Sequence, residues 1–441
     1  MIGTDLTIRM QSRIQWVHTQ LRERFALVTD MTAAYGIHFA NQALPLVTVP
    51  YLSRILGPSM WGLVAMGHAF AMYGSVVVEY GFVYSATRLL ATAETALEFE
   101  RALAGVVGAK MLLSAAALVI AAVAGFSIPV FRSHSMLFWT AVLSELIKAW
   151  LPVYYFYGIK RVAIASLMEI LTRAASAVGI FIFIHKPQDA WIFFALNGVT
   201  AGIAAIVAHL MIYSRYSLRL PRLKDGMAMV REGWPMFLFR SAHNIYTLGN
   251  AFILGLFASP QVVGYYAGAE KISSAAVGLL SPFTTVLYPR AAGLVKTSLR
   301  KAARVTEVSV YITGAASAIL TICMWAGAAW IIPLVLGSKF TPSEPVFQIL
   351  SLRAPMVAWI NVLGFQWLLA LSMEREFQRV TLVALFANVL LAAVFAPGLL
   401  QNGMALAVVI SQAIAALGVF VILHRRGLNP FALARSAESY A

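Results

Sequence analysis

Charged side chains inside long apolar runs are the residues of this chain most able to do chemistry. One charge at the centre of a membrane-spanning helix costs roughly 2.5–3.5 kcal/mol, so such residues normally face a partner or a water-filled cavity. The apolar runs of the 441-residue sequence hold the following charged residues: Glu79, Lys110, Glu145, Lys148, Glu169, Arg173, Arg240, Glu270, Lys271 and Arg353. They are therefore the most informative residues of the chain, because each is expected to face a cavity or a partner.

Two pairs among these residues have the spacing of neighbours on one helix. Glu145 and Lys148 are three positions apart, and Glu169 and Arg173 are four apart, so each pair can neutralise itself within its own helix. The other interpretation is that buried carboxylates bind a proton or Na⁺ during a conformational cycle. The candidates for that role are Glu79, Glu145, Glu169 and Glu270. The sequence leaves both interpretations open.

Arg240 differs from these pairs because no acidic residue lies within four positions of it. Its run carries other polar residues at helical spacing, which predicts one polar stripe: Arg240, His243, Asn244, Thr247 and Asn250. The first apolar run carries a similar stripe: His38, Asn41, Gln42 and Thr48. We expect the two stripes to line a wet central cleft. The alternative is that they form hydrogen bonds between packed helices.

Twelve apolar runs, each close to the roughly 20 residues that cross a bilayer, must position these side chains. The runs are 33–56, 60–84, 104–130, 134–157, 162–184, 190–213, 234–257, 262–288, 308–336, 345–371, 377–397 and 402–424. The chain is 60% hydrophobic and 12% charged, about half the charge of a soluble domain. These observations predict an all-α polytopic membrane protein of about twelve transmembrane helices. The net charge of +15 then indicates basic cytoplasmic segments near anionic lipid, and no nucleic-acid partner.

Lys and Arg concentrate on alternate connections between these runs, which by the positive-inside rule places both termini in the cytoplasm. The sequence therefore divides into a basic interfacial leader, two six-helix lobes, a linker between them and a tail. The predicted bounds are 1–32 for the leader, 33–213 for the first lobe, 214–233 for the cytoplasmic linker, 234–424 for the second lobe and 425–441 for the cytoplasmic tail.

A weak internal repeat relates the two lobes. The residues Pro58, Gly62 and Ala65 recur at one constant offset as Pro260, Gly264 and Ala267. An offset of six helices keeps the direction of each helix, so the lobes would be parallel repeats about a pseudo-two-fold axis along the membrane normal.

Two absences limit the chemistry of the chain. Cys323 is its only cysteine, which excludes a disulfide and a cysteine-rich metal site. The ATP-binding pattern Gly-x-x-x-x-Gly-Lys-Ser/Thr does not occur. We predict no catalytic residues, no metal and no cofactor.

Several short motifs resemble those of a known family. They are the proline-interrupted segment 44–58 with its Pro-Tyr-Leu-Ser-Arg-Ile-Leu-Gly turn, the segment 79–88 ending in Ala-Thr-Arg, the segment 263–272 and the segment 280–290. Together they resemble the polysaccharide flippases, or lipid-linked oligosaccharide translocases, of the multidrug/oligosaccharidyl-lipid/polysaccharide exporter superfamily. The resemblance covers about a quarter of the chain and implies two six-helix lobes around a central cleft.

The resemblance also implies a function. Such a protein would move polyprenyl-pyrophosphate-linked oligosaccharide units from the cytoplasmic to the outer face of the bacterial inner membrane by alternating access. The units would serve cell-surface polysaccharide synthesis, such as O-antigen or exopolysaccharide, and polysaccharide polymerase and chain-length proteins are the expected partners. A guanidinium group can donate two parallel hydrogen bonds to the diphosphate and stays charged. The candidates for binding the diphosphate are therefore Arg240, Arg54, Arg88 and Arg353. Amide and imidazole groups suit sugar hydroxyls, which adds His38, Asn41, Gln42, His243, Asn244 and Asn250.

Two of the arginines and the chain as a whole also fit different roles. Arg88 has the position of a positive-inside loop residue, and Arg54 has that of an anchor at an outer helix end. A cation-coupled drug or metabolite exporter of the same superfamily would have the same architecture. A membrane glycan polymerase or ligase fits less well, because the predicted outer connections are too short to shape an acceptor site.

Overall fold

A computed structural model describes residues 44, 47–217, 219–280, 287–288 and 291–435 of the chain. The side chains of residues 235–236 and 238–248 also lie outside the description. The predicted leader therefore falls outside the described part, as do His38, Asn41 and Gln42. The described residues contain helices and no strand, as the sequence predicted.

The first bundle begins with a helix over residues 47–79. It continues through α2 (Phe82–Thr92), α3 (Ala96–Ser127), α4 (Pro129–Ser133), α5 (Ser135–Ala149), α6 (Val153–Gly158), α7 (Val162–Phe183), the 3-10 turn η1 (Pro187–Asp189) and α8 (Ala190–Tyr213). We call this part the N-terminal lobe. Gly57 has a φ of +66°, the left-handed region that glycine enters without steric cost. It interrupts the first helix at the predicted Gly57–Pro58 turn.

The second bundle, which we call the C-terminal lobe, follows the long helix α9 (Leu223–Leu248). Its elements are α10 (Asn250–Gly255), α11 (Pro260–Gly278), α13 (Leu299–Leu336), the 3-10 turn η2 (Ser338–Ser343), α14 (Glu344–Ser351), α15 (Arg353–Trp359), the π-helix η3 (Ile360–Leu368), α16 (Glu374–Arg425) and α17 (Pro430–Arg435). The long α16 contains a non-helical residue, Leu400, that separates two helical stretches.

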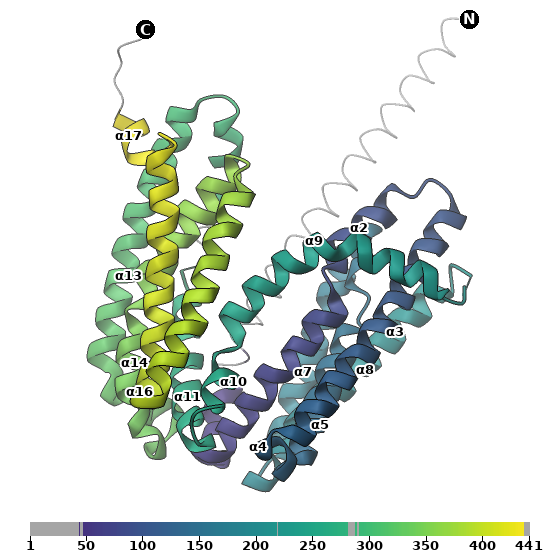
Figure 1. Cartoon of the computed structure of the whole chain (residues 1–441), viewed down its shortest axis with the longest axis horizontal. Helices are drawn as coiled ribbons and strands as arrows, with labels where there is room; N and C mark the ends of the chain where they lie inside the picture. Colours follow the sequence, from purple (N-terminus) through teal and green to yellow (C-terminus); the bar gives the residue numbers. More distant parts are fainter. Residues whose placement is uncertain (1–43, 45–46, 218, 281–286, 289–290, 436–441) are drawn as a thin grey trace, which may run out of the picture.

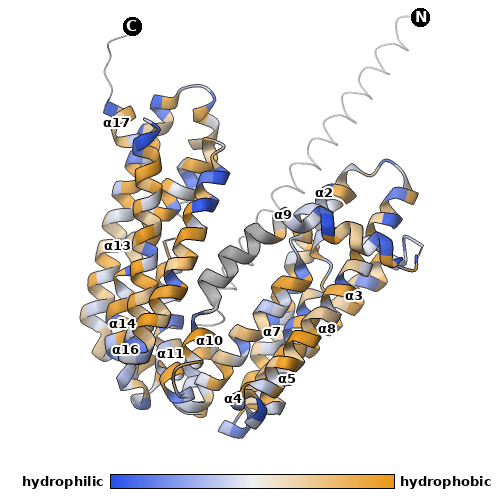
Figure 2. Ribbon diagram, in the orientation of Figure 1, coloured by the Kyte–Doolittle hydropathy of each residue, from blue (hydrophilic) through white to orange (hydrophobic). Residues whose placement is uncertain are grey.

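Eight helices of the described part are long and apolar enough to cross a membrane. Two of them, Val47–Thr92 and Glu374–Arg425, contain the interruptions at Gly57 and Leu400. The multi-pass architecture is therefore confirmed, whereas the count of twelve crossings stays a prediction. Large apolar side chains lie exposed on the outside of both bundles, among them Phe126, Trp330 and Phe386, each more than 70% exposed. Figure 2 shows that hydrophobic residues, in orange, occur along most of the length of the helices in both bundles. Such a surface requires lipid rather than water around it.

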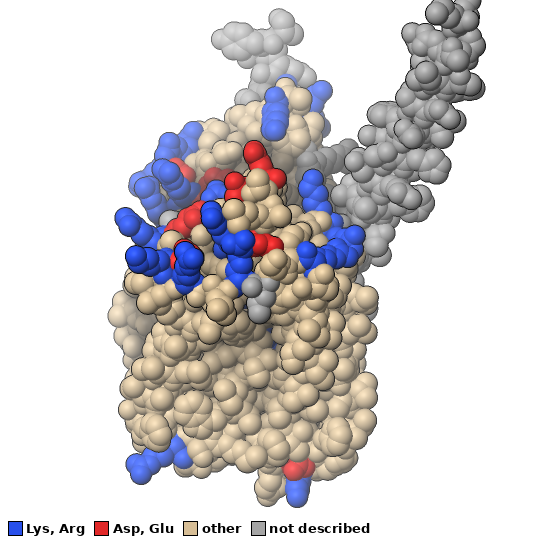
Figure 3. All heavy atoms as spheres, turned by 90° about the vertical axis from the view of Figure 1, so that its right-hand side faces the viewer, with Lys and Arg blue, Asp and Glu red and all other residues tan. Residues whose placement is uncertain are grey.

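The two lobes touch at one end and diverge toward the other, where α2 and α17 lie (Figure 1). Charged residues follow the same division. On the face of the N-terminal lobe shown in Figure 3, they gather toward the diverging end, and a broad band of uncharged residues lies below them. By the positive-inside rule this distribution favours a cytoplasmic diverging end, whereas the cytoplasmic position of the two termini stays a prediction.

The contact between the lobes uses the residues of the internal repeat. A Cβ atom added to Gly62 would overlap the carbonyl oxygen of Pro260, and one added to Gly264 would overlap the carbonyl oxygen of Pro58. Because repeat-related residues meet each other reciprocally, the contact has the form that a two-fold axis produces. Nearby, the Ser53 hydroxyl donates to the carbonyl of Leu336 at 3.2 Å.

Helix α9 connects the lobes. It begins at Leu223, inside the segment expected as a linker, and packs on α3 where Gly226 meets the backbone at Gly108. From there it runs toward the C-terminal lobe, as the teal helix in Figure 1 shows. Arg240 belongs to α9, and its side chain lies outside the description.

Candidate functional site

Two adjoining cavities within the described residues hold the charged residues that the sequence places inside the apolar runs of the N-terminal lobe. The first, of about 330 Å³, is lined by three carboxylates and three cations: Glu79, Glu145, Glu169, Lys110, Lys148 and Arg173. We call it the mixed cavity. The second, of about 250 Å³, is lined by Lys148, Arg173 and Lys271 and, among the described residues, by no carboxylate. We call it the basic cavity. Four residues line both cavities, so the two adjoin: His68, Lys148, Arg173 and Asn197.

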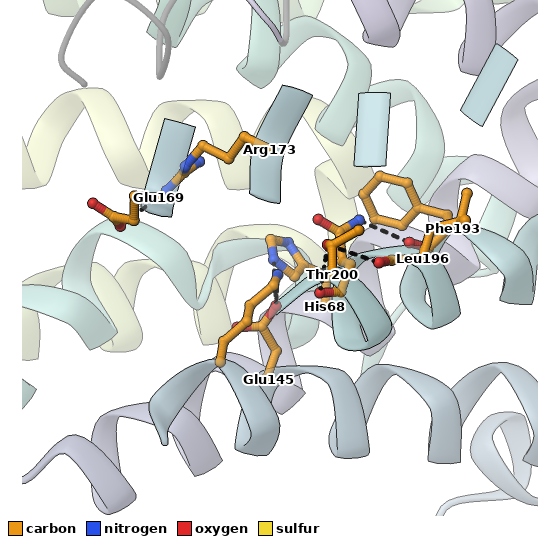
Figure 4. A network of polar contacts seen from close by, with 9 residues as sticks. His68, Glu145, Glu169, Arg173, Phe193, Leu196 and Thr200 are labelled. Carbon is orange, nitrogen blue, oxygen red and sulfur yellow. Dashed lines mark hydrogen bonds and ion pairs between the residues drawn. The ribbon is translucent and has the colours of Figure 1, made fainter. Parts of the chain in front are cut away.

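Glu145 is the centre of the charge network in the mixed cavity. Its side chain is only 5% exposed, and its Oε1 accepts a hydrogen bond from Lys148 Nζ at 2.6 Å. His68 of the first helix lies with Nε2 3.4 Å from the same oxygen, and Figure 4 shows its ring turned toward Glu145. Two groups from different helices thereby stabilise one buried carboxylate, which would otherwise lose its hydration without compensation.

Glu169 and Arg173 form a looser pair on α7. Their charged groups are 3.7 Å apart, and both side chains are at least a third exposed, so water competes with the pairing. Figure 4 shows this pair separate from the His68–Glu145 contact. Arg173 therefore retains donors that a ligand in the basic cavity can use.

Lys110 has a different environment, although it lines the same cavity. It is buried, its Nζ donates to the carbonyl of Ala149 at 2.6 Å, and it lies 5.1 Å from the ring centre of Tyr154. Ala149 is the last residue of α5, where carbonyl groups lack helical partners and favour a cation. Lys110 therefore holds the end of α5, and Glu79 lies close enough to interact with it electrostatically.

The C-terminal lobe contributes Lys271 and a network behind it. Glu270 lies 3.8 Å from Arg353 Nη1, and Ser274 connects them by accepting from Arg353 at 3.2 Å and donating to Glu270 at 2.7 Å. Lys271 follows Glu270 on α11, and consecutive side chains on a helix point about 100° apart. Glu270 thus faces Arg353, while Lys271 faces the basic cavity.

The remaining predicted site residues occupy other places. The Arg54 guanidinium donates to the carbonyl of Leu334 across the contact between the lobes, and Arg88 pairs with Glu232 of α9 at 3.9 Å with its side chain 74% exposed. Asn250 starts α10, is buried, and its Oδ1 has no hydrogen-bond partner in the described part of the chain. The side chains of Arg240, His243 and Asn244 lie outside the description.

The cations of the basic cavity were not among the predicted substrate contacts. Lys148 and Arg173 each have a carboxylate at helical spacing, which favoured self-neutralisation, and Lys271 had only its neighbour Glu270 to suggest a role. His68 gave no signal in the sequence, because a single histidine in an apolar run is usually a packed core residue.

The prediction for this network concerns the two ion pairs. Glu145→Ala should lower the free energy of unfolding by about 1–3 kcal/mol, because it leaves Lys148 and His68 without their shared acceptor. Glu169→Ala is the matched control and should cost about 0–1 kcal/mol, since its pair is exposed. Unfolding of the purified protein in mixed detergent micelles measures both. Equal losses would contradict the central place given to Glu145.

Comparison with known proteins identifies the family of the chain. The model of the family described as "Polysaccharide biosynthesis protein" matches residues 27–295, more than half of the sequence. The chain belongs to the polysaccharide biosynthesis protein family. The resemblance that the short motifs predicted is therefore confirmed.

Two relatives of this polysaccharide biosynthesis protein bear the name of a transporter. A protein of Escherichia coli (strain K12) named "Putative O-antigen transporter" is 27% identical over 358 residues, which cover 80% of this chain and 86% of the relative. A protein of the same name from Shigella dysenteriae is 23% identical and covers 81% of this chain and 89% of the relative. Both names agree with the prediction of a transporter rather than an enzyme.

Solved structures show the same fold. A lipid II flippase, MurJ, in an inward closed conformation, aligns with a TM-score of 0.68 at 14% identity, covering 92% of this chain and 90% of that one. A MATE transporter of Vibrio cholerae, VcmN, aligns with a TM-score of 0.50 at 12% identity, covering 92% and 99%. At these identities the likeness is one of fold, and it agrees with the two-lobe architecture predicted from the sequence.

Proposed function

We propose that this polysaccharide biosynthesis protein transports a polyprenyl-pyrophosphate-linked oligosaccharide from the cytoplasmic to the outer face of the bacterial inner membrane. The product would be a unit of a cell-surface glycan such as O-antigen, as the names of the two relatives suggest. Both termini would lie in the cytoplasm. The named relatives and the membrane architecture support a transporter, while the direction and the substrate are parts of the proposal.

The basic cavity is the observation that carries this proposal. Lys148 and Arg173 reach it from two helices of the N-terminal lobe, and Lys271 reaches it from α11 of the C-terminal lobe. Lys148 and Arg173 already lie beside Glu145 and Glu169, whereas Lys271 has no ion-pair partner among the described residues. A cation of this kind inside a membrane is costly unless an anion comes to it. A diphosphate offers several charged acceptor oxygens, which suit ammonium and guanidinium donors. The hydrocarbon tail would stay in lipid.

Alternating access would follow from the shape of the two lobes. They touch at the Gly62–Gly264 contact and diverge toward the end where α2 and α17 lie, which corresponds to a state open to the cytoplasm in the proposed orientation. Loading the diphosphate from that side, separating the glycine contact and closing the diverging end would expose the basic cavity to the other side. The carboxylates Glu79, Glu145, Glu169 and Glu270 are the groups we propose for coupling to a proton or Na⁺.

The experiment that tests this function uses the native host with the gene under conditional control. Lipid-linked oligosaccharide is quantified on each face of the inner membrane with an impermeant glycan probe, using spheroplasts and inverted vesicles. On depletion we expect accumulation on the cytoplasmic face and loss outside. Units that reach the outer face but stay unpolymerised would indicate a role after translocation. An unchanged glycan distribution would favour a drug or metabolite exporter instead.

A further inference from the structure

The first half of α9 carries an apolar stripe that the rest of the described chain leaves exposed. The side chains of Leu223, Met227 and Trp234 are 62%, 61% and 50% exposed. We propose that this stripe inserts into the membrane leaflet at the diverging end of the lobes, where Lys224 and Arg231 bind the phosphate of an anionic phospholipid headgroup. This lipid site lies outside both cavities and is independent of the proposed substrate.

One face of α9 packs on the N-terminal lobe and so fixes the direction of the other faces. A Cβ atom added to Gly226 would lie 2.9 Å from the carbonyl carbon of Gly108, and one added to Gly233 would lie 3.0 Å from the ring of Tyr80. Successive residues of a helix turn by about 100°, which places the apolar stripe roughly a quarter turn around α9 from this packed face. The stripe therefore lies along one side of the contact with the lobe and is not covered by it.

The charged residues of the same stretch are separated by sign around the helix. Lys224 and Arg231 are exposed and lie roughly 90° around α9 from Leu223, next to the apolar stripe. The acidic Asp225 and Glu232 are also exposed, but they lie roughly 190° from Leu223, on the side opposite the stripe. A helix at a membrane surface needs this order, with apolar side chains in the acyl region and basic ones at the lipid phosphates. Charge complementarity therefore favours an anionic lipid.

The level at which α9 crosses α3 matches a membrane surface. The crossing lies at Gly105 and Gly108 of α3, one to two turns after the exposed Arg101. Beyond the crossing, the exposed residues of α3 from Met111 to Phe126 are all apolar, as lipid contact requires. Figure 1 shows α9 crossing the N-terminal lobe near its diverging end. The stripe thus lies where α3 passes from its charged end into its lipid-facing part.

The test follows the surroundings of one side chain of the stripe in the full-length protein in nanodiscs. Met227→Cys, in a chain that also carries Cys323→Ser, is labelled with a fluorophore. The bilayer is phosphatidylcholine that contains either spin-labelled phosphatidylglycerol or spin-labelled phosphatidylcholine at the same mole fraction. We expect the spin-labelled phosphatidylglycerol to quench the fluorophore at least about threefold more strongly, because two basic residues enrich anionic lipid beside them. The double variant Lys224→Gln, Arg231→Gln should make the two lipids equal, and so should high salt.

The matched control for the two basic residues is the double variant Arg300→Gln, Lys301→Gln. Arg300 and Lys301 are exposed cations at the start of α13, so their loss should leave the lipid preference at position 227 unchanged. Asp225→Cys, labelled in the same way, is the reference for the side of α9 opposite the stripe. Aqueous iodide should quench the fluorophore at position 225 and leave the one at position 227 shielded.

Three results would overturn the lipid site. Equal quenching by the two spin-labelled lipids, in the protein that keeps Lys224 and Arg231, would exclude an anionic headgroup. Iodide quenching at position 227 as strong as that at position 225 would exclude insertion of the stripe. Shielding at position 227 in native membranes but not in nanodiscs would assign the stripe to a protein partner instead of lipid.

Discussion

Replacing Gly62 or Gly264 with alanine should reduce glycan export by at least about tenfold, and leucine at either position should abolish it. The new Cβ would overlap the carbonyl oxygen of the proline on the other lobe. The obstacle is a backbone atom, so no side-chain rotation relieves it, and overpacking of this kind costs about 1–3 kcal/mol or more. The added Cβ destabilises only the state in which the lobes touch at this contact. The conformational equilibrium therefore shifts toward the other state, about tenfold for each 1.4 kcal/mol.

The shift can be seen directly with a cysteine in the basic cavity. Thr48→Cys places it there, in a chain whose only cysteine is removed by Cys323→Ser. In the protein that keeps both glycines, an impermeant thiol reagent should label this cysteine mainly from the side where the lobes diverge. With Gly264→Ala, labelling from the opposite side should increase.

Gly314→Ala provides the matched control for the two glycine variants. Gly314 lies inside α13 and has open space around the position of a Cβ, so alanine should be tolerated and should favour the helix slightly. Wild-type export by both Gly62→Ala and Gly264→Ala, at normal membrane abundance, would show that the lobes do not need this contact.

The second large effect concerns Lys271. Lys271→Ala should weaken binding of polyprenyl diphosphate about 10- to 100-fold, because one charge-assisted hydrogen bond contributes about 1.5–3 kcal/mol. Lys271 is the most informative of the three cations because it has no ion-pair partner among the described residues, so its loss leaves no carboxylate uncompensated there. Lys271→Glu should lose binding altogether, and Lys271→Arg should stay within a few-fold of wild type.

Binding and membrane abundance together separate a ligand role from a structural one. Lys301→Ala is the control, since Lys301 is an exposed cation on α13 outside both cavities. A normal affinity in Lys271→Ala would remove this residue from the anion site. Reduced abundance with unchanged affinity would instead indicate a structural role.

The sequence alone was sufficient for properties that depend on local composition or on one helix. Long apolar runs predict membrane helices because every backbone group must be satisfied within its own segment. The turn at Gly57–Pro58 follows from the two residue types, and the Glu145–Lys148 contact follows from their spacing on one helix. The family was evident from short motifs around these same positions.

Only the tertiary structure decided which side chains of different helices meet. Helical periodicity fixes which residues share a face of one helix, but the rotation of each helix and its choice of neighbours depend on packing across the whole bundle. Packing brings His68 to Glu145 and turns Arg353 to Glu270. It also places Arg54 at the contact between the lobes, where its guanidinium donates to a backbone carbonyl. Lys148, Arg173 and Lys271 come to line one cavity in the same way. The candidate site therefore arises from contacts between helices that no single stretch of sequence contains.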